Sequence, residues 1–183
     1  MGMESIFTVP LFRYRVANWA EQKRKILAEL PKSEPKLLSA AGDTYTDYFI
    51  NQKSGGLPRY KDVVVQVVQP HLQEFADRYP SDVRIDAMWF ERSQRSNYHG
   101  AHNHGSLGFS AVLYVEFDPT AHRPTRFLAP FMHFYSGSLM EYSPENVEEG
   151  TLLLFPSILV HEAPANTSDK LRTIVSFNIK GAS

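Results

Sequence analysis

Residues 98–117, YHGAHNHGSLGFSAVLYVEF, contain the two patterns from which the fold and the site are predicted. In the second half of this stretch every other residue is apolar, which is typical of a β-strand that buries one face. The first half places three histidines within six positions, and this raises the question of which of them bind a metal. The alternating apolar set consists of Leu107, Phe109, Ala111, Leu113, Val115 and Phe117.

Further strands are predicted on both sides of this stretch. From about residue 82 the apolar period is again two, with Arg84, Asp86 and Met88 opposite the apolar set. The segments FLAPFMHFYS (127–136) and GTLLLFPSILVH (150–161) are also strand-like, although proline interrupts both. The sets expected to share a face are Val83, Ile85, Ala87 and Trp89, and then Leu171, Thr173, Val175, Phe177 and Ile179.

The first half of the chain is predicted to be mainly helical. One helix is expected to end before Pro31, and Pro70 is expected to interrupt a second, whose valine-rich run could instead form a strand. Helices followed by many short strands indicate an α+β, mainly β chain whose C-terminal part closes as a jelly roll or barrel. The helical sets are Trp19, Ile26, Leu27 and Leu30, and then Val64, Val67, Val68, Leu72 and Phe75.

Length and charge narrow the class of protein. A chain of 183 residues, 43% of them hydrophobic, predicts one domain over 1–183, with helical support over 1–80 and a β core over 82–180. The net charge of -1 and the pI of about 6.7 come with scattered basic residues. We therefore expect neither nucleic acid nor a membrane as a partner.

The absence of cysteine excludes disulfides, thiolate metal sites and cysteine nucleophiles. Histidine, aspartate and glutamate remain as the side chains able to bind a metal. The first residues, MGMESIFTVPLFRYR, contain no apolar stretch of the length of a signal peptide. These features together predict a soluble cytoplasmic protein in a reducing environment.

Spacing distinguishes the histidines from one another. His102 and His104 are two residues apart, so an extended backbone directs both imidazoles to the same side, whereas His99 is expected to point the other way. Neutral imidazoles suit Fe, Zn, Cu or Ni, and a third ligand is needed. His161, at the end of an apolar strand, is the best candidate, ahead of His122 and His133. A hydrogen-bonded surface pair is the alternative interpretation.

A buried cation is predicted near this site. Arg172, Ile174, Ser176 and Asn178 share one strand face, opposite a mostly apolar face. If the apolar face packs on the helices, Arg172 lines the barrel interior and requires an anionic partner such as a carboxylate. The alternative is an ordinary solvent-facing polar strand face.

At this point the sequence resembles the Fe(II)- and 2-oxoglutarate-dependent oxygenases, and among them the small 2OG-Fe(II) oxygenases of bacteria and phages. The resemblance runs from about Trp89 to Asn178, through HNHGSLGFSAVLYV, EEGTLLLFPSILVHEAPAN and RTIVSFN, with a weaker match at TDYF ending at Phe49. It implies a double-stranded β-helix, a jelly roll of the cupin kind, with N-terminal helices packed on its major sheet.

The resemblance also implies roles for individual residues. The metal ligands would be His102, His104 and His161, where His104 stands at a position that usually carries a carboxylate. A site of three histidines lacks that negative charge. His99 would lie beside the site as an orienting or substrate-side group.

By the same resemblance, Arg172 would bind the distal carboxylate of 2-oxoglutarate. The common Arg-x-Ser partner is absent, since Ile174 stands there and Ser176 follows one step further on the same face. Tyr114 stands where some relatives place a phenol on the same carboxylate, and an aromatic core role is the alternative.

The implied reaction uses Fe(II), 2-oxoglutarate as co-substrate and O2, and hydroxylates a substrate with release of succinate and CO2. A protein side chain, a free amino acid and a small metabolite all remain open as substrate. Arg123 and Arg126 could meet an acidic group on it.

Two other functions are compatible with the sequence. A cupin-type dioxygenase with three histidines would bind its substrate on the iron without 2-oxoglutarate; His104 favours this reading and Arg172 opposes it. A non-catalytic jelly-roll binding module would hold zinc or no metal and would recognise a sugar or a peptide.

Overall fold

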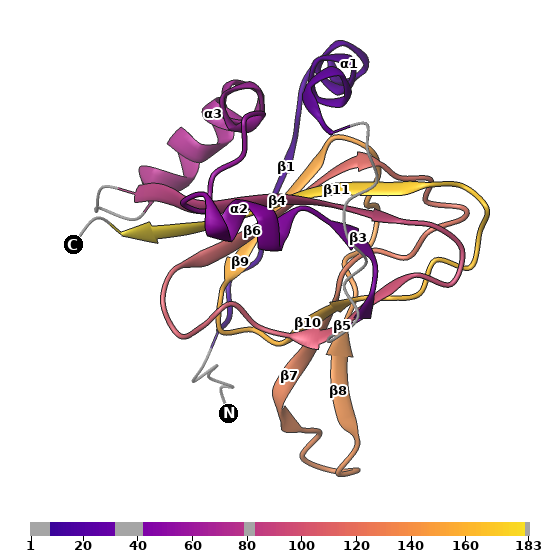
Figure 1. Cartoon of the computed structure of the whole chain (residues 1–183). Helices are drawn as coiled ribbons and strands as arrows, with labels where there is room; N and C mark the ends of the chain where they lie inside the picture. Colours follow the sequence, from indigo (N-terminus) through magenta and orange to yellow (C-terminus); the bar gives the residue numbers. More distant parts are fainter. Residues whose placement is uncertain (1–7, 32–41, 79–82, 182–183) are drawn as a thin grey trace.

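The computed structural model describes residues 8–31, 42–78 and 83–181, and within these ranges it contains two antiparallel sheets and three helices (Figure 1). The elements in chain order are β1 (Phe12–Arg15), α1 (Trp19–Glu29), β2 (Gly42–Asp43), β3 (Tyr45–Thr46), α2 (Tyr48–Lys53), α3 (Lys61–Ala76), β4 (Val83–Ser93), β5 (Tyr98–His102), β6 (Phe109–Glu116), β7 (Arg126–Met132), β8 (Leu139–Tyr142), β9 (Thr151–Pro156), β10 (His161–Ala163) and β11 (Arg172–Gly181).

The strands are distributed between the sheets in the manner of a double-stranded β-helix. The larger sheet has the order β1-β9-β6-β11-β4-β3 and the smaller sheet has the order β2-β5-β10-β7-β8. From β4 onward the chain crosses from one sheet to the other at almost every step, and only the β7–β8 hairpin stays within one sheet. This topology confirms the predicted fold class.

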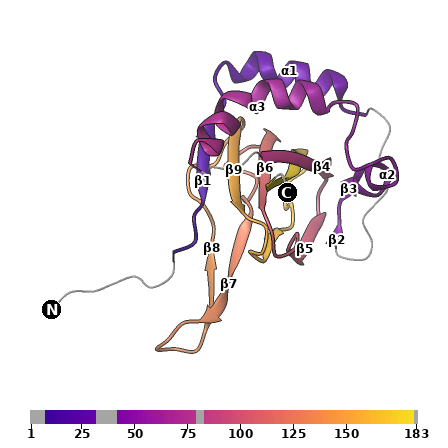
Figure 2. The ribbon, with the colours of Figure 1, turned by 90° about the vertical axis from the view of Figure 1, so that its left-hand side faces the viewer.

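Helices α1 and α3 lie side by side on the outer face of the larger sheet (Figure 2). The buried side chains between these helices and the sheet include Ile26, Val64, Phe75, Phe90 and Phe177. A second apolar cluster lies on the inner side of the larger sheet and includes Val112, Leu153, Phe155 and Ile174. Both faces of the larger sheet are thus mainly apolar, and polar residues between the two sheets are exceptions that suggest a functional site.

Helix α3 corrects one prediction. The helix continues through Pro70 to Ala76, so this proline does not interrupt it, and the valine-rich run is helical. Pro70 is exposed, which lets its ring face solvent. The N-terminal part also contains the short strands β1, β2 and β3, which the helical spacing did not predict.

Strand β4 corrects a second prediction, that Val83, Ile85, Ala87 and Trp89 share one face, because the alternation of faces reverses within the strand. Asn178 pairs with Ala87 and the next residue of β11 pairs with Ile85, so Asp86 is an extra residue in β4. Such a bulge reverses the faces beyond it. Ile85 therefore packs toward the helices, whereas Trp89 faces the space between the sheets.

The ends of the other two alternating sets also depart from the predicted faces. Leu107 and Leu171 are exposed and lie outside the strands. Phe117 packs in the cluster on the inner side of the larger sheet, because the register between β6 and β11 shifts at Thr173 and reverses the phase. The central positions of each set share one face, as predicted, and this face lies against the helices.

The β7–β8 hairpin projects away from the rest of the fold, with Phe134 and Tyr135 exposed near its tip (Figure 1). No helix in the described ranges is long and apolar enough to cross a membrane. Residues 1–7 of the N-terminal segment, for which no signal peptide was predicted, lie outside the described residues.

Candidate metal centre

Three histidines converge between the two sheets. His102 ends β5 and His161 begins β10, and the two residues are direct partners across this antiparallel pair. His104 follows β5, and its backbone N–H donates to the carbonyl of Ser157, 2.9 Å away. One ring nitrogen from each of the three histidines lies within 4.8 Å of the others. The structure thus brings together the three residues predicted as metal ligands.

Hydrogen bonds to the backbone determine which ring nitrogen two of these histidines can offer. Nδ1 of His102 lies 2.7 Å from the carbonyl oxygen of Gly100, and Nδ1 of His161 lies 2.9 Å from that of Leu159. A carbonyl oxygen only accepts, so each Nδ1 carries the proton. In a neutral ring the lone pair is then on Nε2, and it is available to a metal.

Burial keeps these rings neutral. It is the main cause that lowers the pKa of His104 to about 4 and that of His161 to about 3, and the neighbouring histidines add to the effect. Burial also lowers the pKa of His102, again with a contribution from His99. A metal ion needs the deprotonated imidazole, so the site is ready to bind one at neutral pH.

His99 corrects a third prediction, since it lies beside His102 rather than on the opposite side. Ala163 pairs with His99 and His161 pairs with His102, so β5 has one residue more than β10 in this interval. The resulting bulge places residues three apart on the same side. The rings of His99 and His102 are stacked, with centroids 3.9 Å apart and planes 13° apart.

Glu91 and Trp89, which the sequence did not single out for the site, complete this group. Oε1 of Glu91 accepts from the indole Nε1 of Trp89 at 3.0 Å and contacts Nδ1 of His99 at 3.0 Å. The Trp89 indole stacks on His104, with centroids 5.2 Å apart. Glu91 is only 4% exposed. In the sequence, Glu91 is recognisable only as an acidic residue within a largely apolar strand. The face of the strand on which it lies could not be predicted, because the bulge at Asp86 reverses the alternation.

A small internal cavity adjoins the three histidines on the barrel side. Its lining includes Ser110, Thr125, Ile174 and Ser176. Tyr114 lies behind Thr125, whose backbone N–H donates to the phenol oxygen at 2.9 Å and whose hydroxyl lies 2.8 Å from it. Ser176 therefore lines the cavity, while Tyr114 reaches it through Thr125, a residue that sequence reasoning missed.

Arg172 is 3% exposed and lies on the face of β11 that also carries Ile174 and Ser176, two residues of the cavity lining. One terminal nitrogen donates to the carbonyls of Pro164 at 2.9 Å and Arg123 at 3.3 Å, and the other donates to the Ser93 hydroxyl at 3.3 Å. Among the described residues, none forms an ion pair with Arg172, and its Nε has no hydrogen-bond partner. Burial accordingly lowers the pKa of this guanidinium. No carboxylate of the described residues forms an ion pair with the guanidinium, and the charge of Glu91 offsets only part of the effect of burial on its pKa.

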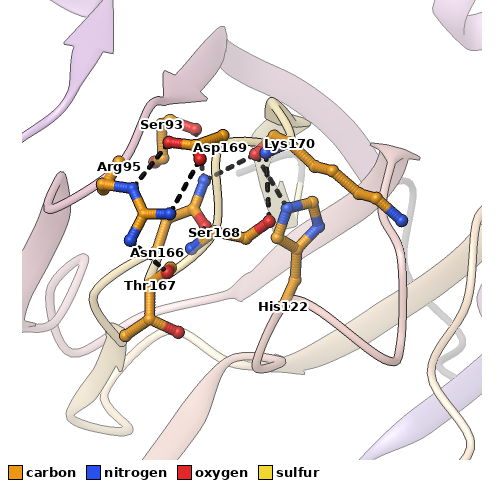
Figure 3. Close-up of polar contacts among 8 residues, drawn as sticks. All are labelled: Ser93, Arg95, His122, Asn166, Thr167, Ser168, Asp169 and Lys170. Carbon is orange, nitrogen blue, oxygen red and sulfur yellow. Dashed lines mark hydrogen bonds and ion pairs between the residues drawn. The ribbon is translucent and has the colours of Figure 1, made fainter.

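Polar contacts connect the loop between β10 and β11 to Ser93, Arg95 and His122 (Figure 3). The Asn166 amide donates to the carbonyls of Ser93 at 2.9 Å and Lys170 at 2.8 Å. Nε2 of His122 donates to the same Lys170 carbonyl at 3.0 Å, and Arg95 pairs with Asp169 at the surface. These contacts hold the end of β11 against the β4–β5 turn and so fix where Arg172 lies.

The remaining candidates take other roles. His122 uses both ring nitrogens in hydrogen bonds to backbone groups, and His133 contacts Ser136 in the exposed hairpin. Arg126 forms ion pairs with Glu162 and Glu141. None of these three residues lines the cavity next to His161.

A second hollow, with a volume of about 210 Å³, borders His102 and His104 as well. Tyr48, Phe49 and Asn103 line it together with Trp89 and His104. It includes part of the TDYF segment, whose Asp47 accepts from the backbone N–H of Phe90 and from the Tyr60 hydroxyl. His102 and His104 thus border both the inner cavity and this partly aromatic hollow, which we call the outer hollow because Phe49 in its wall is exposed.

A family model described as "Putative 2OG-Fe(II) oxygenase" matches residues 87–178. No curated protein sequence matches the chain. Among solved structures, HygX from Streptomyces hygroscopicus with nickel and 2-oxoglutarate is similar at 12% identity and a TM-score of 0.68, over 96% of this chain and 84% of that one.

Two prolyl hydroxylases are similar as well. A prolyl-4-hydroxylase from Pseudomonas putida has 15% identity and a TM-score of 0.63, over 96% of this chain and 95% of the other. The viral collagen prolyl hydroxylase of Paramecium Bursaria Chlorella virus-1, in complex with 2-oxoglutarate, has 13% identity and a TM-score of 0.62, over 94% and 96%. At these identities the similarity establishes the double-stranded β-helix.

Proposed function

Because the chain belongs to the 2OG-Fe(II) oxygenase family, we propose that it hydroxylates a C–H bond of its substrate. In this reaction 2-oxoglutarate and O2 are consumed, one oxygen atom enters the substrate as a hydroxyl group, and the other enters succinate as CO2 is released. Fe(II), 2-oxoglutarate and O2 are the cofactor and co-substrates of the family. The observation that carries the proposal is the cluster of His102, His104 and His161 beside a buried arginine without an acidic partner.

The residues present fit a divalent iron. Three neutral imidazoles converge, and two of them have Nε2 free because Nδ1 donates to a backbone carbonyl. We assign all three as ligands, His104 in the place usually held by a carboxylate. When bound, the metal supplies the activation of oxygen. The protein contributes the orientation of the rings and an environment from which water is largely excluded.

Arg172 is proposed to bind the distal carboxylate of 2-oxoglutarate, because it is a buried cation whose Nε is not engaged by any described residue. A planar guanidinium suits a carboxylate. The Ser176 hydroxyl, which lines the cavity, and the Tyr114 phenol, which acts with Thr125, are proposed as further donors. These groups orient the co-substrate between Arg172 and the histidines.

The outer hollow is proposed to hold the substrate. It is lined by His102 and His104, as the inner cavity is, and Tyr48, Phe49 and Trp89 give it aromatic walls. In this arrangement the co-substrate and the substrate would occupy neighbouring hollows that both border the ligands. HygX has been crystallised with hygromycin B, and a hypoxia-inducible factor peptide occupies a related prolyl hydroxylase of Trichoplax adhaerens, so relatives accept both metabolites and peptides.

A dioxygenase that needs no 2-oxoglutarate is the second candidate, and the all-histidine ligand set favours it. In that case Arg172 would bind the substrate itself or only hold the carbonyls of Arg123 and Pro164. Dependence of oxygen consumption on 2-oxoglutarate distinguishes the two enzymes.

The proposal is tested by measuring succinate from 2-oxoglutarate with Fe(II)-loaded protein in air. The wild-type protein and His133→Ala, which alters a histidine away from the cluster, are expected to release succinate. His161→Ala is expected to release less than about one hundredth of that amount, since it removes a ligand. Equal release from His161→Ala and wild type would contradict the assignment. A mass increase of one oxygen atom in a candidate substrate would identify hydroxylation.

A further inference from the structure

Three neutral imidazole ligands provide no negative charge to balance the two positive charges of a divalent metal ion. Glu91 is a carboxylate buried beside the cluster and lines both the inner cavity and the outer hollow. Among the described residues no lysine or arginine forms an ion pair with it, and its hydrogen-bond partners there are the rings of Trp89 and His99. A buried carboxylate with only these partners requires an explanation.

Both partners of Glu91 lie against proposed metal ligands. His99 is stacked on His102 with centroids 3.9 Å apart, and Trp89 is stacked on His104 with centroids 5.2 Å apart. The same atom, Oε1, binds the ring N–H groups of His99 and Trp89. The Glu91 carboxylate therefore holds the His99 and Trp89 rings, which pack against the proposed ligands His102 and His104.

We propose that Glu91 is a positioning residue for the metal site and supplies, through His99 and Trp89, the negative charge that the ligand set lacks. This inference rests on the proposed function, since it concerns the same three-histidine site. In this role the carboxylate does not bind the metal. It holds the His99 and Trp89 rings against His102 and His104, and its charge stabilises a nearby cation in a poorly solvated environment.

The geometry accounts for two features that otherwise lack a reason. The bulge in β5 brings His99 to the side of His102, where it can reach Glu91. The bulge at Asp86 in β4 turns Trp89 and Glu91 inward, toward the histidines, although the alternation before it points the other way. Together the two irregularities bring these three side chains to the site, His99 through β5 and Trp89 and Glu91 through β4.

The test is the dissociation constant of Ni²⁺, measured by competition with a coloured chelator. Glu91→Gln retains the size of the side chain and removes the charge, and it is expected to bind Ni²⁺ at least tenfold more weakly than wild type. Glu91→Asp retains the charge and is expected to bind more tightly than Glu91→Gln. A matched control is Glu162→Gln, because Glu162 directly follows His161 but pairs with Arg126; its dissociation constant is expected to stay within threefold of wild type.

A wild-type dissociation constant for Glu91→Gln, or an equal loss in Glu91→Gln and Glu162→Gln, would overturn the inference. If Glu91→Gln does not fold, His99→Phe tests the same link, because it retains a ring against His102 and removes the N–H that contacts Glu91. A tenfold loss is again expected, and wild-type affinity would refute the role of the Glu91–His99 pair. Failure of the wild-type protein to bind Ni²⁺ would instead refute the proposed function.

Discussion

Replacing Arg172 with methionine isolates the residue that we assign to the co-substrate. Methionine fills much of the same volume and removes the guanidinium of a residue that is 3% exposed and shares a face of β11 with Ile174 and Ser176, two residues of the cavity lining. Removing one partner of a buried ion pair costs about 3 to 5 kcal/mol. Since about 1.4 kcal/mol corresponds to a factor of ten, 2-oxoglutarate should bind more than roughly 100-fold more weakly.

The same substitution should have a much smaller effect on the folded protein without co-substrate. Arg172→Met loses hydrogen bonds to the carbonyls of Pro164 and Arg123 and to the Ser93 hydroxyl, but it also removes a buried cation without an acidic partner among the described residues. These effects oppose each other, and we expect a net loss below about 2 kcal/mol in the free energy of unfolding.

Calorimetric titration of 2-oxoglutarate into Ni²⁺-loaded protein and urea unfolding of the metal-free protein measure the two quantities. Arg123→Met is the matched control, because the Arg123 side chain is exposed and only its backbone carbonyl contacts Arg172. Its affinity for 2-oxoglutarate should stay within threefold of wild type. A loss below threefold in Arg172→Met, with the protein folded, would refute the assignment of Arg172.

Three further predictions concern stability. The pKa values of His104 and His161 are about 4 and 3 in the folded protein, against about 6.5 in the unfolded chain. The free energy of unfolding of the metal-free protein should therefore be constant above pH 6.5 and fall by about 2 kcal/mol per histidine by pH 4.5. Urea unfolding at several pH values measures this fall, and its absence would contradict the burial of the two neutral rings. Gly108→Ala should destabilise the folded protein by more than about 2 kcal/mol, because φ at Gly108 is +84° and the new Cβ would lie 2.2 Å from the carbonyl oxygen of Ile179. An unchanged melting temperature would contradict this backbone conformation at Gly108. Pro70→Ala should stabilise by about 1 to 2 kcal/mol by restoring a helical N–H in α3, and a lower melting temperature would show that the proline is required there.

The sequence predicted the sheet positions well where apolar residues alternate without interruption. Residues 109–115 and 175–179 occupy the faces expected of them, because the apolar period of two is maintained there. It failed at bulges, where one extra residue reverses the faces beyond it: Trp89 in β4 and Phe117 after β6 are both displaced for this reason. A bulge depends on the pairing of two strands, which one strand's sequence does not reveal.

In the site, too, the residues on regularly alternating strands were predicted and those that depend on bulges were not. The spacing of His102 and His104 predicted a pair on one side, and the strand that ends at His161 predicted the third member. Glu91 and His99 could not be placed, because both depend on bulges that bring distant strands into an unusual register. The direction of Arg172 toward the interior followed from the apolar face opposite it, whereas its neighbours came from loops remote in sequence.

Anaerobic titration of the purified protein with Fe(II) and then 2-oxoglutarate tests whether this chain holds Fe(II) on three histidines and binds 2-oxoglutarate beside them. A visible metal-to-ligand charge-transfer band should appear only when both are present, should be absent from His161→Ala, and should require much more 2-oxoglutarate in Arg172→Met. A wild-type protein that gives no band, or a band that persists unchanged in both variants, would contradict the proposed site.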